Sequence, residues 1–228
     1  PSPVVDGRPF SLPIPAKGSS PTRYADLEAG KFISDLTRKK LRASKYCHLD
    51  PDLDVSARTR AQPTDWKGSL GQESAAQSHL SNQGVGKGDL FLFFGLFRNA
   101  LRCDGKWVFQ GAPFHAIFGW LQVGRVLQVY GNVERILREH PWLAEHPHLH
   151  GEWPKQNAIY IGREALDIPG VELPGWGLLS TPWRLTEEGA RGPATWRVPT
   201  WLDPHQQGTG MTYHPPPRWL GNGRLKAA

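Results

Sequence analysis

Residues 84–129 constrain the fold more than any other part of the chain. This stretch consists of two long apolar runs separated by a polar segment with turn-forming residues. Both runs are rich in aromatic and β-branched side chains, a pattern that is typical of neighbouring strands in one sheet. We expect core strands over 89–97 and 114–129, with a short strand over 106–110 between them.

The segments around these strands predict a few helices and many turns. Amphipathic spacing predicts helices over 31–43, 71–82 and 132–140. The 25 glycines and 21 prolines favour long irregular segments. Gly119 and Gly124 interrupt the second core run, as glycines do at a bulge or a sharp bend of a sheet.

The composition is that of a single domain over 1–228. A hydrophobic content of 39% in 228 residues is sufficient for one large core. We expect the α+β class, with a curved, partly closed mixed β-sheet, a few flanking helices and long loops rich in Pro, Gly and Trp.

The charge of the chain indicates the kind of partner. A formal net charge of +6 and a sequence pI of about 9.5 favour polyanions such as nucleic acid, although a basic protein without such a partner would have the same composition. The two cysteines, Cys47 and Cys103, lie far apart and lack partners at metal-site spacing. No apolar run approaches the length of a membrane span. We therefore expect a cytoplasmic protein with a nucleic-acid or nucleotide partner and no membrane partner.

An H-x-D-x-D group, formed by His48, Asp50 and Asp52, is the first candidate catalytic site. Pro51 disfavours helix at the preceding residue, so we expect an exposed turn that presents the three side chains close together. Two carboxylates and an imidazole can hold a divalent cation, or supply a general base with its orienting acid. The alternative is structural, with the aspartates capping a turn and the histidine bonded to a backbone carbonyl.

Three histidines alternate in the segment HPHLH, at positions 146, 148 and 150. An extended backbone would place all three on one face, as a metal site requires. Pro147 argues against a regular strand, and no carboxylate partner is visible nearby. The sequence therefore favours packing and hydrogen bonding here and leaves the metal ligands and any cofactor undefined.

Polar side chains in and beside the core runs are candidates for a binding pocket. A polar group inside an apolar run must find a partner or face a cavity, because an unpaired buried group costs roughly 1–3 kcal/mol. The same side chains could instead tie the sheet to a helix. The candidate binding residues are Gln72, Gln77, His79, Arg98, His115 and Gln122.

The glycine-rich segment GVGKG at 84–88 superficially suggests a phosphate loop. Phosphate-binding glycine loops follow a strand and open a helix, whereas this segment precedes a predicted strand. A turn is the better interpretation.

In its ordered motifs the chain resembles the nucleotide modification associated domain families, in particular the third family of that name. The resemblance extends over nearly the whole chain. The residues that carry it are PSPVVDGRPFSLPIP, HLDPDL, GQESAAQSHL, GVGKGDLFLFFGLFR, FHAIFGWLQVG, HPHLH, Trp196, Trp201 and Tyr213-His214.

The resemblance implies an α+β domain with a place in nucleotide or nucleic-acid modification in phages and bacteria. Family members begin with a further strand before the segment that matches Pro1, so it also implies that the first strand is missing here. The Gly-Asp turn at Gly88 and the Ile-x-Gly pattern at Ile117 are similar to PUA-like barrels as well.

The sequence is compatible with three functions. The first is a binding module that holds a base or nucleotide beside the central strands. The second is a metal-assisted hydrolase or transferase that acts on a nucleotide through His48, Asp50 and Asp52. The third is a scaffold without a small-molecule site.

Overall fold

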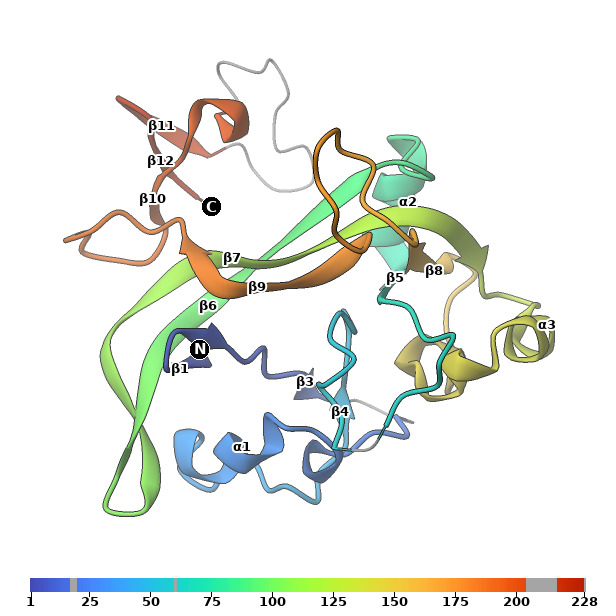
Figure 1. The fold of residues 1–228 in the computed structure, drawn as a ribbon, viewed down its shortest axis with the longest axis horizontal. Coiled ribbons are helices and arrows are strands. Elements are labelled where there is room, and N and C mark those ends of the chain that lie inside the picture. The colour runs from blue at the N-terminus through green and yellow to red at the C-terminus, as the bar shows by residue number, and fades with distance from the viewer. Residues whose placement is uncertain (17–19, 60, 204–216, 228) are drawn as a thin grey trace. The chain divides into compact units, whose positions relative to one another are not determined.

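The computed structural model describes residues 1–16, 20–59, 61–203 and 217–227 (Figure 1). The described part contains three α-helices, one large mixed sheet and two smaller sheets. This confirms the α+β class. The large sheet does not form a closed barrel among these residues, and the PUA-like layout stays a prediction.

Two long strands dominate the ribbon in Figure 1. Strand β6 spans Leu90–Cys103 and β7 spans Lys106–Gln128. They are joined by a tight turn in which Asp104 and Gly105 both have positive φ, 47° and 78°, as the favoured two-residue hairpin turns require. The predicted core strands are thus present. The polar segment between them does not form a separate element, because both strands continue through it to this turn.

The large sheet has the strand order β2-β1-β6-β7-β8-β5, and β9 pairs with β7. Strand β1 runs parallel to β6, whereas β8 runs antiparallel to both β7 and β5, so the sheet is mixed. A register shift between Val123 and Arg125 confirms the bulge predicted at Gly124. The bounds are Ser2–Val5 for β1, Arg8–Pro9 for β2, Ser69–Glu73 for β5, Asn157–Gly162 for β8 and Trp176–Arg184 for β9.

The chain divides into two compact units. The first consists of Pro1–Phe10, Phe93–Phe118 and Leu179–Ala228, and the second of Ser11–Leu92 and Gly119–Leu178. In the first unit, a core around Trp196 and Leu225 packs with the small sheet. This sheet contains β10 (Thr195–Arg197), β11 (Arg218–Gly221) and β12 (Arg224–Lys226).

The second unit contains the three helices and two core clusters. One cluster surrounds Ile136, Leu143 and Ile159, and the other surrounds Tyr24 and Ile33. The helices and the small two-stranded sheet of this unit are β3 (Ile14–Pro15), α1 (Gly30–Leu36), β4 (Cys47–His48), α2 (Ser74–Asn82) and α3 (Val133–Glu139). None of the helices in the described ranges is long and apolar enough to cross a membrane.

Helix α3 confirms the prediction for its segment, whereas two predicted helices are partly wrong. Helix α1 ends at Leu36, and Arg38 and Lys39 follow with positive φ of 52° and 62°. In the segment 71–82 the first residues belong to β5, because they pair with β8, and only the remainder is helical. The segment 84–88 forms the predicted turn into β6.

The core of the second unit yields a stability prediction. Ile159 is fully buried, whereas Ile168 is 42% exposed. We expect Ile159→Ala to lower the free energy of unfolding by about 2–5 kcal/mol, because it leaves a cavity. The matched change Ile168→Ala should cost about 0.5 kcal/mol or less. Urea unfolding of the two variants measures both values, and equal losses would contradict the core described here.

Candidate functional site

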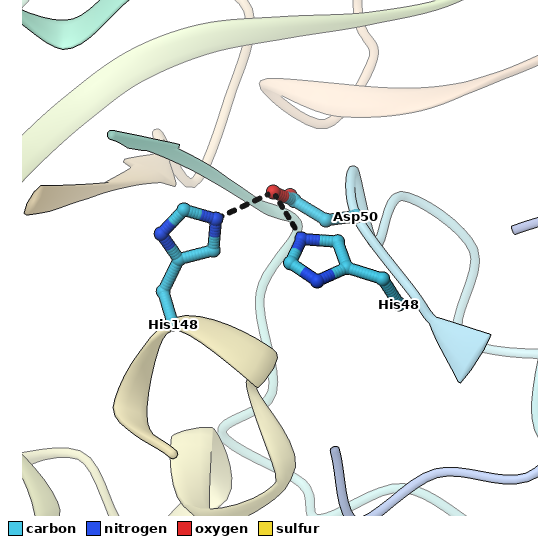
Figure 2. Close-up of side chains that lie close together, drawn as sticks. All are labelled: His48, Asp50 and His148. Carbon is cyan, nitrogen blue, oxygen red and sulfur yellow. Dashed lines mark ion pairs between the residues drawn. The ribbon is translucent and has the colours of Figure 1, made fainter. Parts of the chain in front are cut away.

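His48, Asp50 and His148 bring their polar atoms together in the second unit, as Figure 2 shows. Asp50 Oδ2 lies 3.6 Å from His48 Nε2 and 3.3 Å from His148 Nε2. One ligand-type atom from each residue lies within 4.8 Å of the other two. Among the described residues, this is the group of His, Cys, Asp and Glu side chains whose spacing suits a metal ion.

Three separate elements position these side chains. His48 ends β4, which pairs with β3. Asp50 follows directly, and the next residues are held against β5 by an isolated bridge between Asp52 and Ser69. His148 comes from the 3₁₀ helix Pro147–Leu149, far along the chain.

One expectation about this region is wrong. The segment at Asp50 was expected to be an exposed turn, but the side chains of Asp50 and His48 are only 5% and 20% exposed, because β5 and the 3₁₀ helix cover them. The HPHLH segment is not extended. As a 3₁₀ helix it directs His148 toward Asp50, while His150 bonds the carbonyl oxygen of Ala144 at 2.7 Å.

Hydrogen bonds behind the cluster fix its orientation. The backbone N–H of Gly71 donates to Asp50 Oδ1 at 2.8 Å, which leaves Oδ2 for the imidazoles. His148 Nδ1 lies 2.6 Å from Asn157 Oδ1, and Asn157 Nδ2 donates to the carbonyl oxygen of His148. Because Asn157 Oδ1 can only accept, Nδ1 of His148 carries a proton. In the neutral ring, Nε2 therefore presents a lone pair to the Asp50 carboxylate.

Close packing holds the His148 ring in this orientation. The Trp153 indole stacks on it with a centroid distance of 4.7 Å and an interplanar angle of 3°. On the strand side, a Cβ at Gly71 would lie 2.2 Å from His148 Cδ2, so only glycine fits there. The sequence gives no local signal for this contact.

The ionisation of the cluster follows from burial and pairing. Burial alone would raise the pKa of Asp50, but hydrogen bonds from His148 and His48 hold that pKa well below its usual range. Burial would lower the pKa of His148, but the Asp50 carboxylate more than offsets this and raises it. Without a bound cation, the site is therefore a carboxylate paired with an imidazolium.

Asp52, the third residue of the predicted catalytic group, has a different partner. Its Oδ2 pairs with Arg58 at 3.5 Å, and Arg58 also contacts Glu145 at 3.0 Å. Burial raises the pKa of Asp52 to about 7, although the Arg58 guanidinium opposes the shift. Its catalytic role stays a prediction, but it is not one of the three clustered ligands.

The remaining histidine of the segment, His146, is buried beside the cluster. Its Nδ1 accepts a hydrogen bond from the backbone N–H of His148 at 3.2 Å and so caps the 3₁₀ helix. Burial lowers the pKa of His146 to about 3, so its imidazole is neutral.

The predicted binding residues of the second unit lie on β5, α2 and β7. Gln72 pairs with Ala158 across the sheet, and His79 lies on α2. Gln77 accepts a hydrogen bond from the Tyr160 hydroxyl. Gln122 donates to the carbonyl oxygen of Gly88 and accepts from the backbone of Asp167. The side chains of Gln77 and Gln122 thus tie elements together.

In the first unit, His115 and Arg98 also have partners within the protein. His115 Nδ1 accepts a hydrogen bond from Trp196 Nε1 at 3.0 Å. Arg98 donates to the carbonyl oxygen of Gly111 and lies over the Phe109 ring. A ligand-binding role for the six predicted residues stays a prediction. Tyr213 and His214 lie outside the described residues.

Comparison with known proteins gives one match. The family model described as nucleotide modification associated domain 3 matches residues 1–228. No curated protein and no solved structure matches the chain.

The buried ion pair predicts a pH-dependent stability in EDTA-treated protein. Because the folded-state pKa of Asp50 is depressed, its contribution is present above pH about 4 and is lost as the pH falls further. Because the pKa of His148 is raised, its contribution is lost as the pH rises beyond about 6.5. We expect Asp50→Asn to cost about 3–5 kcal/mol between these limits and less outside them.

Urea titrations of the wild type and Asp50→Asn at pH 3, 5.5 and 9 measure this window. Asp167, 66% exposed and paired with Arg163, offers the control Asp167→Asn. A destabilisation by Asp50→Asn that is constant across the three pH values would contradict the assigned ion pair.

Proposed function

Because the chain belongs to the nucleotide modification associated domain 3 family, we propose that it is a metal-dependent enzyme that modifies a nucleotide or a base of nucleic acid. The metal ligands in this proposal are His48 Nε2, Asp50 Oδ2 and His148 Nε2. The binding of a base or nucleotide without catalysis, the first function expected from the sequence, is the second candidate, and the family supports it equally.

The proposed metal site is supported by two lone pairs that face each other, one on His148 and one on Asp50. The Asn157 contact directs the protonated nitrogen of neutral His148 away from Asp50, so Nε2 and the carboxylate Oδ2 face each other as acceptors at 3.3 Å. Such a contact needs a positive charge between or on the groups. A proton on His148 satisfies it in the metal-free protein, and a divalent cation satisfies it together with His48.

The two separations from Asp50 Oδ2 suit such a cation. With bonds of about 2.1 Å, two ligand atoms of a tetrahedral metal lie about 3.4 Å apart, and two adjacent ligands of an octahedral metal about 3.0 Å. The observed separations from Asp50 Oδ2 are 3.3 and 3.6 Å. Two imidazoles and one carboxylate suit zinc or iron(II), and three protein ligands leave positions for water or substrate.

The roles of the protein groups follow from these contacts. A bound cation would supply a Lewis acid that polarises a substrate oxygen or activates water. Gly71 and Asn157 orient the ligands from behind, as outer partners do in metal sites. Trp153 stacks on His148 and limits the motion of its ring.

Loss of a ligand predicts loss of metal. We expect the wild type to bind one Zn²⁺ or Fe²⁺ per chain, and His48→Ala and His148→Ala each to weaken binding by at least about 100-fold, because two ligands remain. The matched variant His150→Ala, in the same loop but bonded to Ala144, should keep wild-type affinity. Calorimetry and elemental analysis measure both, with circular dichroism as a check of folding. Equal affinity in all three variants would disprove the assignment.

The activity is tested with the same proteins. Metal-loaded wild type is incubated with nucleotides and with DNA, and mass spectrometry of the digested products detects a modified base or nucleotide. The proposed function requires a mass change that His48→Ala abolishes and His150→Ala retains. Tight nucleotide binding without any metal-dependent product would favour the second candidate.

The packing behind His148 yields a further prediction. Gly71→Ala places a methyl group into the His148 ring, so we expect a 10–100-fold loss of metal affinity, the range found when outer partners of a metal site are lost. At Gly192 an added Cβ would meet nothing within 4 Å, so Gly192→Ala should leave affinity unchanged. Calorimetric titration of both variants makes the comparison, and unchanged affinity in Gly71→Ala would mean that the ring is not held as described.

A further inference from the structure

A cavity of about 310 Å³ lies within the second unit, beside the candidate metal centre. Its wall includes Leu49, Asp52 and His146, which lie within two residues of the clustered ligands in the sequence. The His146 and His148 rings are 5.6 Å apart. We call this space the Asp52 cavity. Its volume is in the range of small-molecule sites.

Three residues of the cavity wall each carry a buried polar atom without a hydrogen-bond partner. Among the described residues, the buried side-chain atoms without a partner are Asp52 Oδ1, Gln62 Nε2 and His146 Nε2. All three residues line the Asp52 cavity. An unsatisfied buried polar group costs about 1–3 kcal/mol, so their concentration in one cavity indicates a polar ligand.

The hydrogen-bonding character of these atoms follows from their neighbours. His146 Nδ1 accepts from the backbone of His148, so Nε2 of the neutral ring carries the proton and is a donor. Gln62 Nε2 is a second donor. Asp52 Oδ2 accepts from Arg58, and Oδ1 is an acceptor without a partner among the described residues.

Aromatic side chains complete the cavity wall. Trp66 and Trp142 both line it, and an indole is a stacking surface for a planar ring. A nucleobase combines a planar ring with an edge that carries both donors and acceptors. It matches this wall because its ring can stack on an indole while its edge forms hydrogen bonds.

A second cavity, of about 560 Å³, shares Trp142 with the first. We call it the Lys87 cavity. Four cationic side chains line it, against the two carboxylates of Asp65 and Glu164. The cations are Lys67, Lys87, Arg125 and Arg163.

Lys87 is the cation of this cavity that is available to a ligand. Lys67 pairs with Glu164, and Arg125 contacts Glu139. Arg163 pairs with Asp167. Lys87 is exposed and forms no ion pair with another residue in the described part of the chain. Cationic side chains in a cavity are the usual partners of phosphate.

We propose that the Asp52 cavity binds the base of a nucleotide and that the Lys87 cavity binds its phosphate, with Trp142 between the two. The ligand is either a free nucleotide or one unit of a single strand. The proposal deepens the proposed function by placing its substrate next to the metal centre, but binding itself needs no metal.

Binding of nucleosides, nucleoside 5′-monophosphates and a ten-nucleotide single strand tests the proposal. Calorimetric titrations are run in EDTA at 50 and 200 mM salt with the four common bases. We expect at least one nucleotide to bind, and more tightly than its nucleoside. A strand that binds more than tenfold tighter than the nucleotide identifies a polynucleotide substrate, and equal affinities identify a free nucleotide.

Two variants separate the two cavities. Gln62→Leu should weaken nucleoside and nucleotide alike by about 3–10-fold, the effect of one hydrogen bond. Lys87→Gln should weaken the nucleotide but not the nucleoside and should reduce the salt dependence. Lys45→Gln, which removes the same charge at an exposed site in the same unit, should change neither.

The outcomes distinguish this proposal from the metal site. Gln62→Leu should keep wild-type metal affinity, and His48→Ala should keep wild-type nucleoside affinity. No binding of any nucleoside, nucleotide or strand to the wild type, or unchanged binding in Gln62→Leu, overturns the base site whatever the metal result. Equal loss in Lys87→Gln and Lys45→Gln overturns the phosphate site.

Discussion

The carboxylate of Asp50, held between two imidazoles, is the interaction on which the candidate site depends. A buried carboxylate is costly unless it is paired and hydrogen-bonded. Here Oδ1 accepts from the backbone of Gly71 and Oδ2 faces His48 and His148. The contact joins β4, β5 and the 3₁₀ helix of the HPHLH segment, so the geometry of the site and the packing of these elements depend on each other.

Further side chains surround the Asp50 cluster on two sides. The Asn157 side chain and the Trp153 ring set the orientation of His148 from behind. On the other side, His146 contributes Nδ1 to the helix cap, and its buried Nε2 has no hydrogen-bond partner among the described residues. His146 thus contacts the His148 ring of the candidate metal centre and also lines the Asp52 cavity.

The sequence predicted the parts of the fold that depend on local patterns. The strands β6 and β7, the helix α3 and the bulge at Gly124 follow from apolar periodicity and glycine placement. The segment at Gln72 is a strand instead of a helix because its pairing with β8 outweighs its helical composition. Such pairing between distant segments cannot be read from one sequence.

The same distinction applies to the site. The H-x-D spacing marked His48 and Asp50 as candidates, since two polar side chains on one short turn form a local pattern. His148 stood out only as one of three alternating histidines, and its contact with Asp50 comes from folding. Asn157 and Gly71 had no signal, because their roles are hydrogen bonds to His148 and Asp50 that form only when the chain folds.

The central claim is that His48, Asp50 and His148 bind one divalent metal ion. An anomalous difference map from a crystal of the metal-loaded protein tests it most directly. We expect one peak about 2.0–2.2 Å from His48 Nε2, Asp50 Oδ2 and His148 Nε2. A metal-loaded crystal with no peak at these three atoms, or with its peak at other residues, would contradict it.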